Sequence, residues 1–230
     1  MKKYKYLLFD LDDTILDFGA AENKALEFVL NSHEVAYRPD LYNRYKTINQ
    51  THWEMLERNE LMKDKVLSKR HEVFFDELGL KVDGVIVDKM YRTQIAEHGH
   101  QLFEGALETI QQLSSEYYLC IITNGVKVTQ EKRLNNSGIL PYFKDVFISE
   151  DTGYQKPMKA FFDHVAGRIE GFRPKEALII GDSLTSDILG GINSGIDTCW
   201  YNPEEKSNPY DFRPVFEIRQ LNELFQILDR

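Results

Sequence analysis

The sequence predicts an α/β protein: a doubly wound parallel sheet with helices on both faces and an inserted helical segment. Three observations predict it. From residue 118 onward, short apolar runs alternate with amphipathic helical stretches, as in sheets built from strand–helix–strand units. The apolar run over residues 6–9 supplies an earlier strand. Residues 18–98, in contrast, contain long, charged, helix-favouring stretches with no strand pattern between them.

The individual elements follow from the same patterns. Strands are expected over residues 4–10, 118–123, 146–149, 177–181 and 197–200. Helices are expected over residues 104–115, 126–137, 158–169, 186–194 and 220–228, with Gly138 and Gly195 as left-handed caps. The inserted part is expected to form four helices that include residues 41–59 and 63–78. The predicted domains are a core of residues 1–17 and 99–230 and a helical cap of residues 18–98, with Gly19 and Gly99 as candidate hinges.

Charge and composition exclude several classes of partner. The formal net charge of -9 argues against nonspecific binding to nucleic acid or to anionic membranes, which requires clustered Lys and Arg. Only a short apolar stretch separates Lys3 from Asp10, so we expect neither a signal peptide nor a membrane span, and a cytoplasmic location. Cys120 and Cys199 lie in apolar runs and are expected to be buried, reduced thiols. No protein partner is evident from the sequence.

Two carboxylates follow the first predicted strand. Asp10 and Asp12 lie two residues apart in Asp10-Leu11-Asp12-Asp13-Thr14, at the carboxyl edge of the sheet, where open α/β sheets place their ligands. Like charges this close need a cation or a shared proton. Taken alone, the segment is equally consistent with a polar turn that closes the strand.

Polar clusters also follow the second and third predicted strands. Thr123-Asn124-Gly125 lies between a strand and a helix, where a hydroxyl and backbone N–H groups favour anions, although an ordinary Asn-Gly turn is the alternative. Lys156-Pro157 is expected at the start of a helix. An ammonium is unfavourable there unless carboxylates or a phosphate hold it, so Lys156 is a candidate site residue.

The fourth predicted strand is followed by Gly181-Asp182-Ser183, and Asp187 comes five residues after Asp182. A helix cap explains one of these carboxylates. Two of them at another strand end indicate a metal, and oxygen ligands without His or Cys favour Mg²⁺. Asp182 and Asp187 are therefore candidate metal ligands.

These four clusters, in this order and with the insert between the first and second, resemble the haloacid dehalogenase (HAD)-type phosphohydrolase superfamily over essentially the whole chain. The resemblance implies the strand order 3-2-1-4-5, with Cys120 and Cys199 about 14 Å apart, too far for a disulfide. Within the superfamily the chain resembles the YjjG-type branch of nucleoside 5′-monophosphate phosphatases. The segments that carry this second resemblance are 122–125, 148–151 and, most specifically, 186–193 leading to Thr198-Cys199-Trp200.

The superfamily resemblance implies a Mg²⁺-dependent phosphomonoester hydrolase with an aspartyl-phosphate intermediate. Asp10 is then the nucleophile, and Asp12 is the general acid and base. Thr123 and Asn124 bind the phosphoryl oxygens, and Lys156 neutralises Asp10 and the substrate. The metal is held by Asp10, the backbone carbonyl of Asp12 and Asp182, with Asp187 orienting a metal-bound water.

The cap is expected to determine the substrate, a small phosphomonoester and, by the resemblance, a pyrimidine, deoxy or damaged nucleotide. Side chains that could contact a base or ribose are Asn49, His52, Trp53 and Arg70. Trp53 is equally explained as cap core, and Arg70 as a solvated helix face. A sugar-phosphate phosphatase or phosphomutase shares all four motifs. A receiver-like signalling module is the alternative that is not an enzyme, but receivers are about half this length and lack an insert.

Overall fold

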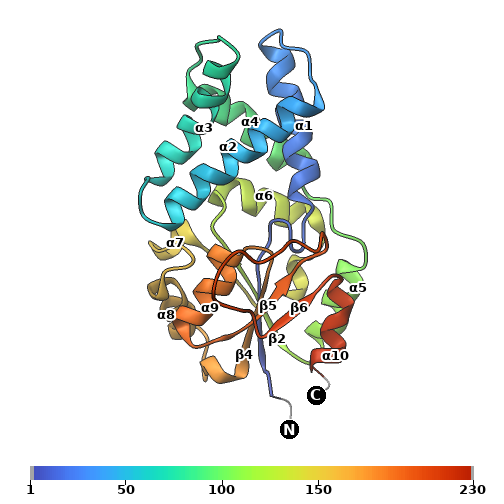
Figure 1. Ribbon diagram of the computed structural model, residues 1–230. Coiled ribbons are helices and arrows are strands. Elements are labelled where there is room, and N and C mark those ends of the chain that lie inside the picture. Colours follow the sequence, from blue (N-terminus) through green and yellow to red (C-terminus); the bar gives the residue numbers. More distant parts are fainter. Residues whose placement is uncertain (1–2, 229–230) are drawn as a thin grey trace. The chain divides into compact units, whose positions relative to one another are not determined.

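The computed structural model describes residues 3–228 (Figure 1). The chain divides into two compact units, one made of the residues up to Asp17 and from Gln101 onward, the other spanning Phe18–His100. The second unit ends two residues later than the predicted boundary after residue 98, because the Gly99 N–H still closes the last helical turn on the Ile95 carbonyl (2.7 Å). Among residues 3–228, no helix has both the length and the apolar character of a membrane span.

The first unit is built on a parallel sheet of six strands in the order β3-β2-β1-β4-β5-β6. The strands are β1 (Tyr6–Phe9), β2 (Tyr118–Thr123), β3 (Asp145–Ile148), β4 (Ala177–Gly181), β5 (Asp197–Tyr201) and β6 (Phe216–Ile218). The order of the first five is the predicted one. The edge strand β6 was not predicted, because three residues are too few to show a period, and its conformation depends on pairing with β5, such as Tyr201 with Ile218.

Both faces of the sheet are apolar, because successive side chains of a strand point to opposite sides. In β1, Leu7 and Phe9 belong to one core cluster, whereas Tyr6 and Leu8 belong to the other. The helices of this unit are α5 (Ala106–Ser114), α6 (Lys127–Ser137), α7 (Ser149–Thr152), α8 (Lys159–Arg168), α9 (Leu189–Ser194) and α10 (Leu224–Leu228). α5 and α10 contribute to the first cluster and α8 to the second, so helices cover both faces, as predicted.

Several helix boundaries differ from the prediction. The expected helix over residues 186–194 is a π-helical turn, Leu184–Ile188, followed by α9, and a 3-10 turn, Leu221–Glu223, precedes α10. Two further 3-10 turns cover Leu140–Tyr142 and Pro174–Glu176. The predicted left-handed caps are confirmed, with φ angles of 75° at Gly138 and 68° at Gly195. Both cysteines are buried and free, as predicted.

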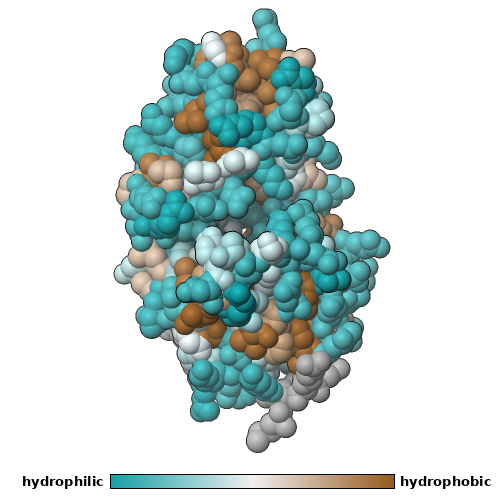
Figure 2. Space-filling view, viewed as in Figure 1, coloured by the Kyte–Doolittle hydropathy of each residue, from teal (hydrophilic) through white to brown (hydrophobic). Residues whose placement is uncertain are grey.

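The second unit consists of α1 (Phe18–Ser32), α2 (Pro39–Glu57), α3 (Lys63–Glu77) and α4 (Gly84–His98). Gly19 lies in the first turn of α1, and Gly99 directly follows α4. Apolar side chains from all four helices form one core. The view in Figure 2 shows a mainly hydrophilic surface with small hydrophobic patches, as expected for a chain with 28% charged residues.

This helical unit also buries a polar network. Arg70 donates one hydrogen bond to the Asn49 amide oxygen (2.6 Å) and one to the Asp88 carboxylate (2.7 Å). Asn49 in turn donates to Glu22 (2.7 Å), which also accepts from Tyr91 (3.2 Å). All five side chains are at least nine-tenths buried. The interpretation of Arg70 as a solvated helix face is therefore wrong, because its guanidinium is paired inside the unit.

His71 lies in the same interior and predicts a pH dependence of stability. Its ring stacks on Tyr45 and lies edge-on to Tyr91. The Asp88 carboxylate is 3.5 Å away, and the cations of Arg70 and Arg92 are also near. Burial lowers the pKa of His71 to about 4, against the opposing effect of Asp88. In the unfolded chain His71 is protonated below about pH 6.5, whereas in the folded chain it is protonated only below about pH 4. Stability is therefore lost as the pH falls through this window.

We expect His71 to account for a loss of about 3 kcal/mol in unfolding free energy between pH 7 and pH 4. Urea unfolding of the wild type and of His71→Gln at both values measures it, because the variant lacks the titrating ring and should show a smaller loss. The exposed His98→Gln is the matched control. Equal losses in the wild type and His71→Gln would contradict the assignment.

Candidate active site

The site begins where β1 ends. The Asp10 N–H donates to the Ile180 carbonyl of β4 (2.8 Å), which continues the β1–β4 pairing and holds Asp10 beside Gly181. Asp10 is 6% exposed, and the Thr14 hydroxyl reaches its carboxylate (3.4 Å). The chain then turns sharply, with Asp13 at a φ of 53°, a left-handed conformation that Asp tolerates better than most residues.

Lys156 joins this carboxylate to a second one. Its ammonium donates to Asp10 (2.5 Å), to Asp187 (2.7 Å) and to the Ile122 carbonyl (3.1 Å). Burial alone would lower the pKa of the Lys156 amine, but the two carboxylates outweigh it and raise this pKa above its usual value. Lys156 therefore stays charged. It lies in the turn before α8 rather than at its start, so the carboxylates hold the ammonium without a helix end being involved.

Asn124 fixes the backbone of Lys156. Its amide oxygen accepts from the Lys156 N–H and its amide nitrogen donates to the Lys156 carbonyl, both at 2.9 Å. These two bonds tie the loop after β2 to the segment between α7 and α8 that carries Lys156. The Asn124 side chain thus has a role that the sequence analysis did not foresee, and its contact with a phosphoryl group stays a prediction.

Asp182 and Asp187 come from the segment after β4. Trp200 on β5 donates its indole N–H to the Asp182 carbonyl (2.8 Å) and so fixes that loop. Asp187 lies in the π-helical turn, a conformation common at functional sites, and is fully buried. A Cβ at Gly181 would lie 2.3 Å from Asp187 Cγ, so only glycine allows this carboxylate to approach the strand end.

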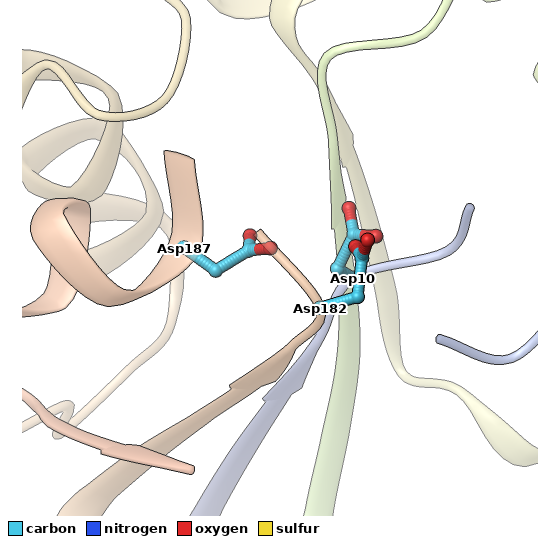
Figure 3. Close-up of side chains that lie close together, drawn as sticks. All are labelled: Asp10, Asp182 and Asp187. Atoms are coloured by element: carbon cyan, nitrogen blue, oxygen red, sulfur yellow. The ribbon is translucent and has the colours of Figure 1, made fainter. Parts of the chain in front are cut away.

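Asp10, Asp182 and Asp187 each offer a carboxylate oxygen within 4.8 Å of the others (Figure 3). Figure 3 shows the Asp10 and Asp182 carboxylates next to each other at neighbouring strand ends, with Asp187 pointing toward them from its helical turn. Burial raises the pKa of Asp10 to about 8, against the opposing effect of Lys156. Burial also raises the pKa of Asp182 well above its usual range, and the charge of Asp10 adds to this.

One ammonium therefore faces three clustered carboxylates, and two of them gain protons more readily than usual, chiefly because they are desolvated and also because carboxylates lie close together. A divalent cation neutralises such a cluster, and carboxylate oxygens are the ligands that Mg²⁺ prefers. The donor set fits Mg²⁺. The Asp12 carboxylate is not part of this cluster, and the role of its backbone carbonyl as a ligand stays a prediction.

Asp12 is instead held from α6. Its two carboxylate oxygens accept from Arg133 and from Gln130, the latter at 2.7 Å. Gln130 also donates to the Thr123 hydroxyl (2.9 Å). Neither Gln130 nor Arg133 was predicted from the sequence. Their spacing of three places them on one helix face, but only the docking of α6 shows that this face points inward.

The predicted site residues thus fall into two groups. Those of the four strand-end clusters meet in the first unit, namely Asp10, Asp12, Thr123, Asn124, Lys156, Asp182 and Asp187. The candidates for contacting a base lie in the helical unit, where Asn49 and Arg70 are buried and Trp53 is partly exposed. The Arg70 guanidinium lies 6.0 Å from the centre of the Trp53 ring.

Residues 4–195 match the family model of the haloacid dehalogenase-like hydrolases. The chain therefore belongs to this hydrolase family. Two relatives named pyrimidine 5′-nucleotidase support the assignment of the chain to the YjjG-type branch of this family. They are PynA of Streptococcus pneumoniae and YjjG of Escherichia coli. PynA is 39% identical, and the match covers 99% of this chain and 96% of PynA. YjjG is 28% identical, and the match covers 98% of each chain.

A third relative, the HAD-hydrolase YfnB of Bacillus subtilis, is 48% identical over 100% of this chain and 97% of its own. Its crystal structure, described as bound to magnesium, matches with a TM-score of 0.94 at 47% identity and 100% of both chains. The L-2-haloacid dehalogenase of Xanthobacter autotrophicus shares the fold with a TM-score of 0.78, but only 16% identity. Membership of a hydrolase family is inconsistent with the receiver-like alternative.

Proposed function

We propose that this protein is a Mg²⁺-dependent phosphomonoester hydrolase that acts through an aspartyl-phosphate at Asp10, most readily on nucleoside 5′-monophosphates. The observation that carries the proposal is the buried Lys156 ammonium, hydrogen-bonded to Asp10 and Asp187 at the strand ends. A carboxylate nucleophile that must approach a phosphate dianion needs a cation at this place. A halide leaving group needs neither a proton donor nor a metal, so Asp12 and Asp182 favour phosphoryl transfer over dehalogenation.

The reaction has two steps, each assigned to residues of the chain. Asp10 attacks phosphorus, the bond from phosphorus to the alcohol oxygen breaks, and Asp12 gives its proton to that oxygen. Water then attacks the aspartyl-phosphate, Asp12 takes a proton from the water, and the bond from Asp10 to phosphorus breaks. Lys156 and Thr123 stabilise the negative charge on the phosphoryl oxygens in both steps. The products are the alcohol and inorganic phosphate.

The metal ion would be held by Asp10 and Asp182, with Asp187 beside them and the Asp12 backbone carbonyl as a further ligand. When bound, Mg²⁺ supplies positive charge to the phosphoryl group. The cluster of three carboxylates supports this assignment, because its charge exceeds what the single ammonium of Lys156 neutralises.

The substrate class rests on the relatives. PynA and YjjG are both named pyrimidine 5′-nucleotidases, and each matches this chain over nearly its whole length. We therefore propose pyrimidine nucleoside 5′-monophosphates as the preferred substrates. Sugar phosphates and phosphomutase activity are the alternatives within the family.

A panel of phosphomonoesters tests the function and the substrate class together. Phosphate release from 5′-UMP, 5′-AMP, glucose 6-phosphate and p-nitrophenyl phosphate would be measured with Mg²⁺ and with EDTA. We expect the highest kcat/KM for 5′-UMP, and loss of activity in EDTA. Preference for the sugar phosphate would contradict the nucleotide proposal, and equal activity in EDTA would contradict the metal requirement.

Trp53 is the candidate in the helical unit whose role a single variant can test. If its partly exposed ring stacks on the base, Trp53→Ala should raise KM for 5′-UMP by about tenfold, as expected for a stacking energy of about 1–3 kcal/mol. KM for p-nitrophenyl phosphate should stay unchanged because this substrate has no base. Trp53→Phe, which keeps an aromatic face, is the matched control. Equal losses on both substrates would indicate a packing role.

A further inference from the structure

A closed set of hydrogen bonds connects α6 to two residues of the proposed reaction. Gln130 donates one amide hydrogen to Asp12 (2.7 Å) and the other to the Thr123 hydroxyl (2.9 Å), and its amide oxygen accepts from Arg133 (2.8 Å). Because Arg133 can only donate, the orientation of the Gln130 amide is fixed. Arg133 completes the set by donating to the second oxygen of Asp12.

The surroundings show that this arrangement is built into the fold. Gln130 is 1% exposed and Arg133 is fully buried, whereas the Asp12 side chain remains 28% exposed. A Cβ at Gly125 would lie 2.3 Å from the Gln130 amide nitrogen, so a glycine is required where the Gln130 side chain passes the β2 loop. The buried Gln130 and Arg133 side chains therefore hold a carboxylate that is itself partly exposed.

The same bonds fix the polarity of the Thr123 hydroxyl. Its oxygen accepts from Gln130 (2.9 Å) and from the Gly125 N–H (3.1 Å), which occupies both lone pairs. Toward any ligand, this hydroxyl can act only as a donor. A donor is what a phosphoryl oxygen requires.

We infer that Gln130 and Arg133 are positioning residues of the active site: together they hold the Asp12 carboxylate by both oxygens, and Gln130 keeps the Thr123 hydroxyl as a donor. This inference rests on the proposed role of Asp12 as proton donor and acceptor. Each oxygen of Asp12 keeps a further lone pair for the reacting proton. The two hydrogen bonds therefore fix the orientation of the carboxylate without preventing proton transfer. Misplacing a reacting group by about 1 Å costs about 10²-fold in rate.

The first test measures 5′-UMP hydrolysis with Mg²⁺ by Arg133→Met and Gln130→Leu. We expect kcat to fall by about 10- to 100-fold in each, with KM changed less than threefold in Arg133→Met. Arg133→Lys, which can still donate to Asp12, should recover part of the loss. Lys132→Met, at an exposed neighbouring position of α6, should match the wild type. If either site variant keeps its kcat within twofold, or gains activity, the inference is overturned.

The second test separates positioning of Asp12 from general support of the fold. p-Nitrophenolate leaves without a proton, so its release in a single turnover with excess enzyme should persist in Asp12→Asn. If Arg133 acts through Asp12, adding Arg133→Met to Asp12→Asn should leave this release rate unchanged. A further loss in the double variant would show a structural role and overturn the inference. If the wild type itself releases no nitrophenolate, the proposed function fails, and this inference fails with it.

Discussion

Asp10→Asn should abolish phosphate release while the protein stays folded. The amide cannot form the aspartyl-phosphate, and removing a nucleophile that forms a covalent intermediate costs about 10⁴-fold or more in kcat. The fold should persist because Lys156 keeps its bonds to Asp187 and to the Ile122 carbonyl. The measurements are kcat for 5′-UMP with Mg²⁺ and the urea midpoint of unfolding.

Asp163→Asn is the matched control for this variant. Asp163 lies on α8, where its side chain is 60% exposed and paired with Lys159. The same chemical change there should leave both kcat and the unfolding midpoint at their wild-type values. Full activity of Asp10→Asn would exclude covalent catalysis at this position, and an unfolded variant would show that the carboxylate is needed for structure.

The strand-end residues could be predicted because their positions follow from local patterns. An apolar run precedes each of these positions: Asp10 and Asp182 follow one, and Thr123 is the last residue of another. The carboxyl ends of parallel strands meet at one edge of the sheet. Knowing where the strands end is therefore enough to bring these residues together. Lys156 could be predicted for a different reason, because an ammonium at the start of a helix needs nearby carboxylates or a phosphate, although α8 begins at Lys159, three residues after Lys156.

The residues that were missed depend on contacts between distant parts of the chain. Gln130 and Arg133 lie 118 and 121 residues from Asp12, and nothing local shows which face of α6 is buried. The polar network of the helical unit was missed for the same reason. Arg70 on a charged helix looks exposed until Asn49 and Asp88, from two other helices, are placed around it.

Lys156→Met should both destabilise the protein and abolish turnover. The substitution leaves Asp10 and Asp187 buried without the cation that now lies 2.5 Å and 2.7 Å from their oxygens. Removing one partner of a buried ion pair lowers the free energy of unfolding by about 3–5 kcal/mol, because the remaining charge is uncompensated. We therefore expect a loss of about 3 kcal/mol in unfolding free energy in EDTA, together with loss of turnover. Lys159→Met, at a position of α8 that is 60% exposed, should change neither.

A second substitution tests whether excess negative charge causes this loss. In Lys156→Met with Asp10→Asn, one of the two uncompensated carboxylates is gone, so part of the stability should return, although turnover should not. Mg²⁺ should raise the melting temperature of Lys156→Met more than that of the wild type, because a divalent cation neutralises the same carboxylates. If Lys156→Met were as stable as the wild type in EDTA, the result would show that the Lys156 ammonium is not what allows Asp10 and Asp187 to be buried together.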